Sequence, residues 1–259
     1  MEGARFRRVI LRRDGLRRPF PHNFAARLER RTIRTLLRRG KYLLAELSSG
    51  ETLVMHLGMS GSMRIDRDVR GQRRDSDANR HDHVVFQLSS GVSVTFNDPR
   101  RFGAMDLVPR GQLAEHPALG AMGPEPGGPD FDGAVLARTC AGKRTALKLA
   151  LLDQRVVAGL GNIYASEALH RAGLSPRRIA STIATSSGRP RPGAHRLAAA
   201  IKDVLQDAIE RKAMPSSRAS RFRVYDREAE RCSTKGCGGT IRRFWQAGRS
   251  TFYCPDCQR

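Results

Sequence analysis

Four cysteines near the C-terminus have the spacing of a metal site. Cys232 and Cys237 are followed by Cys254 and Cys257, and the segment between the two pairs reads as a strand, a turn and a second strand. Four thiolates presented by two such knuckles form a closed tetrahedral zinc site, which is structural because no coordination position remains for water. The sequence therefore predicts one structural zinc ion at the base of a hairpin. The fifth cysteine, Cys140, stands apart and is expected to be a buried core thiol.

The surface of this hairpin is available to a partner, because a zinc-held hairpin is too small to have a core of its own. Arg242, Arg243 and Arg249 lie on it, where they could contact the phosphates of a nucleic acid. Zinc ribbons also bind RNA and proteins, so the finger alone leaves the partner open.

A second motif, residues 156–176, has the features of a phosphate-binding helix start. Asn162 is a good N-cap for a helix that begins at Ile163, and Gly159 and Gly161 would let the backbone approach an anion closely. A capped core helix after a tight turn explains the same residues equally well.

The third motif, residues 96–107, predicts a turn that exposes two cations beside an aromatic ring. Arg100, Arg101 and Phe102 would stand at its tip, where a wedge could enter a base stack and offset the cost of unstacking. The alternative is a Phe that packs within its loop beside two solvated arginines.

Lys41 is the candidate for proton transfer or nucleophilic attack. It precedes an apolar strand and follows the pair Arg38-Arg39, and both cationic neighbours and partial burial lower the pKa of an ammonium group. An ordinary lysine at a strand edge is the alternative. His56, His81 and His83 could bind a metal or a phosphate, although hydrogen-bonded histidines are typical of such strands.

The charge of the chain indicates a polyanionic partner. Its 47 Lys and Arg residues exceed its 25 Asp and Glu residues, for a formal net charge of +22 over 259 residues. It has no apolar run long enough to span a bilayer and no signal-peptide pattern, so a soluble cytoplasmic protein is expected.

The elements that must position these residues fall into an α+β arrangement. Short apolar runs separated by Ser-Gly turns from 41 to 108 predict antiparallel hairpins in a β-sandwich or barrel, interrupted by a polar loop at 66–80. Helical periodicity follows in 143–153, 162–173 and 195–212, with a Ser-, Pro- and Gly-rich loop at 180–194. The apolar face of the last helix comprises Leu197, Ile201, Val204, Leu205, Ala208 and Ile209. The expected domains are a sheet domain (1–119), a linker (120–133), a helical domain (134–225) and the finger (226–259).

Several motifs, in the same order along the chain, resemble the formamidopyrimidine-DNA glycosylase family. They are KYLL, HLGMSG, HDHV, DPRRFG, MGPEP as a near match to LGPEP, GNIYASE, and the terminal GRSTFYC-x2-CQ. The resemblance implies a β-sandwich, a helical domain with a helix-two-turns-helix motif and a zinc-finger hairpin. It also implies a base-excision repair enzyme that acts as a monomer on double-stranded DNA, removes oxidised or ring-opened purines and cleaves abasic sites by β,δ-elimination.

The resemblance assigns roles to individual residues. Lys41 matches the lysine of β-elimination, and Arg249 matches the arginine of δ-elimination and phosphate binding. Asn162 matches the phosphate ligand at the helix start. The family's DNA contacts correspond here to His81, Arg100 and Arg144. The three family residues that fill the gap left by a flipped base correspond to Met59, Arg100 and Phe102.

Two departures from the family pattern bear on activity. Family members begin with Pro-Glu-Leu-Pro-Glu, whose proline amine is the nucleophile, whereas residues 3–13 resemble the strand after the family's first helix. An N-terminal truncation is therefore expected, either from a start placed at an internal Met or as a real feature of a DNA-binding protein that excises no base. Residues 212–228 are shorter than the family's lesion-capping loop, which leaves lesion preference open. Another zinc-ribbon nucleic-acid-binding protein, including an RNA binder, is the third alternative.

Overall fold

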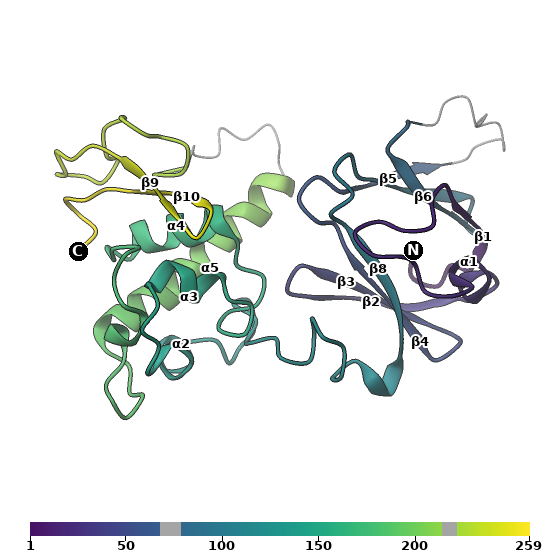
Figure 1. Ribbon diagram of the computed structural model, residues 1–259, viewed down its shortest axis with the longest axis horizontal. Coiled ribbons are helices and arrows are strands. Elements are labelled where there is room, and N and C mark those ends of the chain that lie inside the picture. Colours follow the sequence, from purple (N-terminus) through teal and green to yellow (C-terminus); the bar gives the residue numbers. More distant parts are fainter. Residues whose placement is uncertain (68–78, 214–221) are drawn as a thin grey trace. The chain divides into compact units, whose positions relative to one another are not determined.

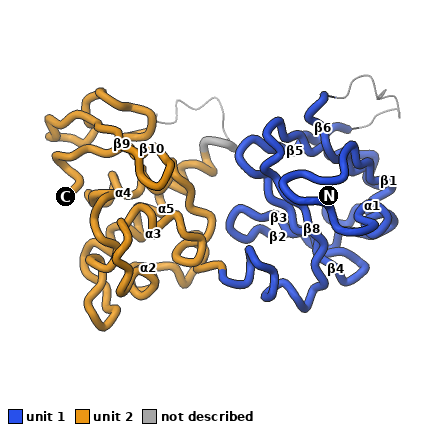
Figure 2. Tube along the Cα trace, viewed as in Figure 1, with its two compact units in different colours: residues 1–121 blue, residues 122–259 orange. Residues whose placement is uncertain are grey.

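The computed structural model describes residues 1–67, 79–213 and 222–259. The chain divides into two compact units, Met1–Ala121 and Met122–Arg259 (Figure 2). The finer four-part division expected from the sequence stays a prediction. None of the helices in the described ranges combines the length and the apolar character that a membrane span requires.

The first unit is built on two antiparallel four-stranded sheets (Figure 1). One sheet has the order β1-β6-β7-β5 and the other β2-β3-β4-β8. The elements are β1 (Phe6–Leu11), α1 (Phe24–Leu28), β2 (Ile33–Arg39), β3 (Tyr42–Leu47), β4 (Glu51–His56), β5 (Ser62–Arg67), β6 (Asp82–Leu88), β7 (Val92–Asn97), β8 (Ala104–Pro109) and the short η2 (Arg110–Gln112). The predicted β-sandwich and its two Ser-Gly hairpins, β3–β4 and β6–β7, are confirmed.

The sandwich is held by apolar side chains that alternate along its strands. Phe6, Phe86 and Phe96 are fully buried, and the rings of Phe6 and Phe86 lie 5.4 Å apart. The predicted polar loop begins later than expected, because Asp66 and Arg67 still pair with β7. Residues 68–78 of that loop lie outside the described residues.

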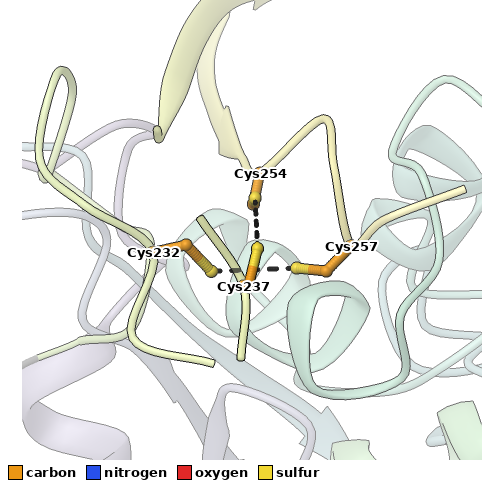
Figure 3. A group of neighbouring side chains, drawn as sticks. All are labelled: Cys232, Cys237, Cys254 and Cys257. Atoms are coloured by element: carbon orange, nitrogen blue, oxygen red, sulfur yellow. Dashed lines mark hydrogen bonds between the residues drawn. The ribbon is translucent and has the colours of Figure 1, made fainter. Parts of the chain in front are cut away.

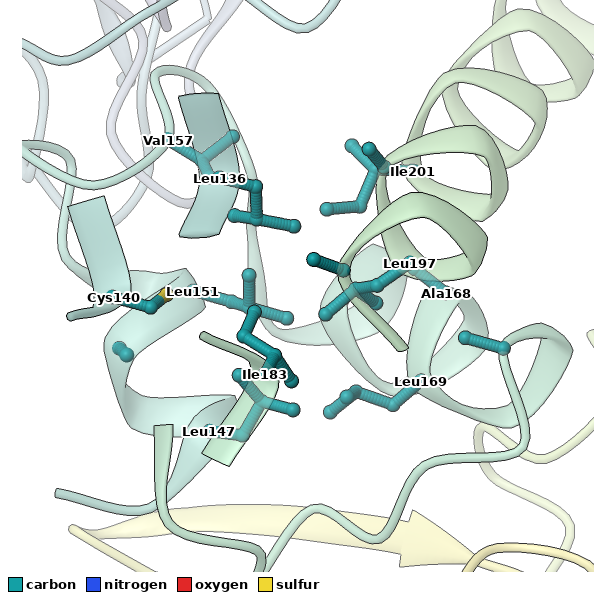
Figure 4. Close-up of a cluster of buried hydrophobic side chains, with 14 of the residues drawn as sticks. Leu136, Cys140, Leu147, Leu151, Val157, Ala168, Leu169, Ile183, Leu197 and Ile201 are labelled. Carbon is teal, nitrogen blue, oxygen red and sulfur yellow. The ribbon is translucent and has the colours of Figure 1, made fainter. Parts of the chain in front are cut away.

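The second unit packs helices around one apolar core and carries a hairpin after them. Its elements are α2 (Gly133–Cys140), α3 (Leu147–Leu152), α4 (Asn162–Arg171), η3 (Ala180–Ile183), α5 (Pro192–Ala213), β9 (Arg242–Gln246) and β10 (Arg249–Tyr253). Side chains from α2, α3, α4 and α5 meet in the core, where Leu136, Leu151 and Leu197 are fully buried (Figure 4). Cys140 is also fully buried, and burial raises the pKa of its thiol to about 11, as expected for a core cysteine.

Three helix predictions differ from the structure. Helix α3 begins only at Leu147, because Ala146 is engaged in a β-bridge with Ile179. The predicted loop at 180–194 contains η3, and α5 begins at Pro192, where the missing proline N–H leaves no helical bond unmade. The periodicity places Ile209 on the buried face of α5, but its side chain is 64% exposed. The apolar face of the helix extends beyond the core that it packs on, since Leu205 is the last of these apolar residues in contact with that core.

Candidate functional site

The four C-terminal cysteines converge on one point from two knuckles (Figure 3). Their sulfur atoms all lie within 4.8 Å of one another, and the pairs Cys232–Cys257 and Cys237–Cys254 have Sγ–Sγ distances of 3.7 Å. A tetrahedron of sulfurs with zinc–sulfur bonds of about 2.3 Å has edges of about 3.8 Å. The observed spacing therefore fits a tetrahedral metal ion bound by four thiolates.

The protein around the cluster lowers the pKa of one thiol and packs closely against the sulfur atoms. Burial alone would raise the pKa of Cys232, but hydrogen bonds with Thr234 and His170 lower that pKa to about 6. Gly239 lies so close to the cluster that a Cβ atom there would come within 2.8 Å of the Cys254 sulfur. The knuckle therefore needs glycine at this position.

Two side chains from the helices bind the hairpin at the same carbonyl oxygen. Lys148 of α3 donates from Nζ to the Ser250 carbonyl (3.1 Å) and to the Thr251 hydroxyl (2.7 Å). Asn162 of α4 donates from Nδ2 to the same Ser250 carbonyl (3.0 Å). Strand β10 is thus fixed immediately after Arg249, the residue assigned to δ-elimination.

The predicted N-cap role of Asn162 is wrong. Asn162 is the first residue of α4, Gly161 occupies the cap position, and no side chain caps the helix. The amide of Asn162 is used instead across to Ser250, and its Oδ1 is buried with no hydrogen-bond partner in the described part of the chain. The side chain is therefore committed to tertiary structure within the second unit.

The burial of Lys148 predicts a specific pH dependence of stability. Lys148 is fully buried, and burial, with the charge of Arg249, lowers its pKa from 10.5 to about 8. Between these two values the unfolded chain binds the extra proton, so the free energy of unfolding rises as pH increases from about 8 to about 10.5. The rise approaches about 3 kcal/mol, since one pKa unit corresponds to about 1.4 kcal/mol.

Urea unfolding of the wild type and of Lys148→Met across this pH range measures the effect. The stability difference between the two chains should change with pH in the stated direction. Lys202→Met, at an exposed position of α5, is the matched control and should follow the wild-type profile. Parallel profiles for all three chains would contradict the assignment.

A buried carboxylate joins α4 to the segment that leads into the hairpin. Glu167 is 4% exposed and accepts hydrogen bonds from the backbone N–H groups of Arg223 (2.8 Å), Val224 (2.9 Å) and Tyr225 (2.9 Å). Val224 packs with Phe252 and Cys254 in the small core of the finger. Glu167 therefore positions the finger through the segment that precedes its first knuckle.

In the first unit, the structure brings Met59, Arg100 and Phe102 together at two adjoining loops. All three are exposed, Met59 at 73% and Phe102 at 42%, and the Arg100 guanidinium lies 4.6 Å from the centre of the Phe102 ring. The loops touch at Gly58, whose φ is +70° and where a Cβ atom would lie 2.5 Å from the Phe102 carbonyl carbon. The prediction of an exposed tip with an aromatic beside cations is confirmed in its geometry.

The two loops are held by one buried aspartate. Asp98 is fully buried and accepts hydrogen bonds from Ser60 Oγ (2.6 Å) and from the Gly103 N–H (2.7 Å). Its own N–H donates to the carbonyl of His81 (3.0 Å), which places the predicted DNA contact His81 beside the same loop. His83 is buried and its Nε2 lies 2.8 Å from the Asp98 carbonyl oxygen, so it is part of the scaffold.

Lys41 lies at the turn between β2 and β3, next to a basic cleft. Its side chain is exposed. Partial burial, followed by the charges of Lys41 and Arg17, lowers the pKa of His56. His56 and Phe102 both line a cleft of roughly 380 Å³ together with Arg17 and Tyr42. Lys41 and the exposed loop tip therefore border the same region of the first unit.

The remaining candidate residues lie in the second unit. Arg144 is exposed in the segment between α2 and α3, and Arg249 is exposed as the first residue of β10, paired with Gln246 across the hairpin turn. Sequence reasoning missed Lys148 and Glu167. The available signal was a charged residue within an apolar helical run, ALKLALL for Lys148 and YASEALH for Glu167.

Models of known families match most of the chain. One described as "Formamidopyrimidine-DNA glycosylase N-terminal domain" matches residues 1–105, and one described as "Formamidopyrimidine-DNA glycosylase H2TH domain" matches residues 122–220. The formamidopyrimidine-DNA glycosylase of Bradyrhizobium sp. strain BTAi1 is 54% identical over 278 residues, and that of Beijerinckia indica is 55% identical over 272 residues. Each alignment covers 100% of this chain and 94% of the relative.

Solved structures give the same result. The Lactococcus lactis formamidopyrimidine-DNA glycosylase bound non-covalently to DNA containing an abasic (AP) site superposes with a TM-score of 0.84 at 28% identity, covering 100% of this chain and 94% of that one. The MutM (Fpg) protein of Thermus thermophilus superposes with a TM-score of 0.82 at 36% identity, covering 100% and 92%. A complex of the Lactococcus protein with DNA containing FAPY-dG gives 0.83 at 28% identity, covering 99% and 93%. The chain therefore belongs to the formamidopyrimidine-DNA glycosylase family of DNA-repair enzymes.

Proposed function

We propose that this protein is a base-excision DNA glycosylase with AP lyase activity, acting on oxidised or ring-opened purines in double-stranded DNA. The observation that carries the proposal is the exposed group of Met59, Arg100 and Phe102. The two loops that present it are held together by hydrogen bonds to the buried Asp98. An enzyme that works on a base must take it out of the stack, and an apolar side chain, a cation and an aromatic wedge suit the gap that is left.

The relatives' ligands support the substrate class. The Lactococcus protein has been solved with DNA that contains an abasic site and with DNA that contains FAPY-dG. The net charge of +22 on this chain favours the same kind of polyanion. Arg100, Arg144 and His81 serve as DNA contacts in this proposal, and the backbone at the start of α4 serves as a phosphate ligand beside Asn162.

Two residues carry the elimination steps in this proposal. Lys41 transfers the proton of β-elimination, and its exposed ammonium group borders the basic cleft of the first unit. Arg249 binds the phosphate and assists δ-elimination, and its position at the hairpin tip is set by the bonds of Lys148 and Asn162 to Ser250. The metal held by the four cysteines is zinc, which is structural and takes no part in the reaction.

Borohydride trapping tests the activity. The chain is compared with the same chain extended by the Pro-Glu-Leu-Pro-Glu segment and first helix that the family resemblance places before it. Each is incubated with duplexes containing an oxidised guanine, an abasic site or no lesion. We expect the extended chain to form a covalent adduct on both damaged duplexes and to cleave the strand, and both chains to prefer damaged DNA.

Arg249→Ala is expected to lower strand cleavage by the extended chain by at least about tenfold, because the phosphate loses its charged partner. Arg231→Ala, at an exposed arginine of the finger that precedes the hairpin strands, is the matched control and should retain cleavage. Binding should weaken steeply with salt, since phosphate contacts release counterions. If the extended chain forms no adduct on either damaged duplex, the enzymatic assignment is overturned. A flat salt profile would overturn the phosphate contacts.

A further inference from the structure

The hairpin carries a large exposed aromatic side chain that the roles assigned above do not use. Trp245 is the single tryptophan of the chain and is 66% exposed. It lies on β9, one residue before the strand ends, and pairs with Ser250 of β10. Tryptophan at a surface of this kind combines a large apolar area with low conformational entropy, which is typical of a contact residue.

Side chains alternate between the two faces of the hairpin, and Trp245 and Arg249 lie on opposite faces. Residues paired across the two strands share a face, so Trp245 and Arg243 lie with Ser250 and Phe252. Arg249, paired with Gln246, belongs to the other face, where the Thr251 side chain is bonded to Lys148. The two faces of the hairpin therefore present different groups.

Trp245 is the outermost residue in a series of contacts between aromatic rings and the Arg243 guanidinium group. Tyr225 contacts Phe252 edge-on at 5.0 Å, and the Arg243 guanidinium lies 5.9 Å from the Phe252 ring and 5.3 Å from the Trp245 ring. Tyr225 is itself held by its N–H bond to Glu167. The indole is thus supported on a continuous series of contacts that reaches the buried core of the finger.

The charge beside the indole favours a polyanion as its partner. Arg243 forms an ion pair with Glu228 at 3.6 Å, and the side chains are 37% and 52% exposed. An ion pair as exposed as this contributes little to stability, so a phosphate could replace the carboxylate at little cost. An aromatic ring beside such a cation forms a stacking platform for a nucleotide.

We propose that the Trp245–Arg243 face of the hairpin is a second DNA contact, in which Trp245 packs against a nucleotide and Arg243 exchanges Glu228 for a phosphate. The contact lies on the face opposite Arg249, so it adds affinity for DNA without taking part in the reaction. The inference rests on the proposed function, because it requires a DNA ligand.

The single tryptophan makes the contact directly measurable. The full chain, loaded with zinc, is titrated with undamaged and abasic duplexes while tryptophan fluorescence and the anisotropy of labelled DNA are recorded together. We expect the fluorescence of Trp245 to be quenched in proportion to the fraction of DNA bound. Trp245→Ala should weaken binding to both duplexes about tenfold or more, and Trp245→Phe should keep most of the affinity.

The control is Ile209→Ala, which removes an apolar side chain of similar exposure (64%) from α5 and should bind DNA as the wild type does. Equal zinc content and circular dichroism show that each variant is folded. If the wild type binds no DNA by anisotropy, the proposed function fails. If it binds while the fluorescence stays constant and Trp245→Ala binds equally well, only this inference fails. A fluorescence shift that depends on protein concentration without DNA would assign the face to a second copy of the chain and overturn the DNA contact.

Discussion

Removal of the metal is expected to abolish tight DNA binding, with a loss of affinity of at least about 100-fold. Among the described residues, the small core of the finger and its preceding segment has five buried members, and two of them are the metal-site thiols Cys232 and Cys254. Structural zinc contributes roughly 10–16 kcal/mol to the folding of small finger domains, so the hairpin should unfold without it. Arg249 and Trp245 would then lose the strand pairing that places them. Chelator titration with simultaneous measurement of released zinc and DNA anisotropy gives the result.

Two cysteine substitutions separate the metal site from general effects of thiol loss. Cys254→Ser should bind less than one zinc ion per chain and lose DNA affinity, whereas Cys140→Ala should keep both, because Cys140 lies in the helical core. The first unit should keep its circular dichroism in all cases. DNA affinity that persists after complete zinc removal would take the finger out of the binding mechanism.

Glu167→Ala is expected to destabilise the second unit by about 3–5 kcal/mol. The substitution removes a buried carboxylate and leaves three backbone N–H groups without their acceptor, of which the one on Val224 is in a fully buried residue. Val224 and Tyr225 support Phe252, so the loss should extend into the finger and lower DNA affinity as well. Urea unfolding monitored by circular dichroism measures the stability.

Glu230→Ala is the matched control for this change. Glu230 is an exposed acid of the same unit, and its ion pair with Arg227 is solvent-accessible, so the cost should stay below about 1 kcal/mol. Glu167→Gln keeps one acceptor oxygen and should recover part of the stability. A Glu167→Ala chain as stable as the Glu230→Ala chain would show that the segment 223–225 is held by other contacts.

The metal site could be predicted from the sequence because its determinants are local. All four thiols lie within one hairpin and its flanking knuckles, so their spacing alone brings them together once the turn forms. The Ser-Gly hairpins of the sandwich were predictable for the same reason, since a tight turn sets the pairing of the strands that flank it. The exposed tip with Arg100 and Phe102 was likewise visible in the residues of its own turn.

The partners of the residues that support the site were not predictable, because each hydrogen bond joins residues far apart in the chain, although a charged residue within a helical run marks Lys148 and Glu167 as unusual. Lys148 lies 102 residues from Ser250, and Glu167 lies 57 residues from Val224. A hydrogen bond from one side chain to a distant backbone group leaves no periodicity or spacing in the sequence. Asn162 shows the consequence: its residue type favours a helix cap, yet a carbonyl on β10 takes its amide and the cap position passes to Gly161.

By itself, the sequence determined the α+β architecture, the cluster of four thiols and the positive charge, which depend on local pattern and composition. Only the tertiary structure decided which polar side chains are structural and which are exposed to a ligand. Asp98 and Lys148 are fully buried and hold other segments through hydrogen bonds, whereas Trp245 is exposed at the surface and contacts the Arg243 guanidinium. The physical reason is that burial depends on which surfaces meet, and a polar group can be buried only where the folded chain supplies its hydrogen-bond partners.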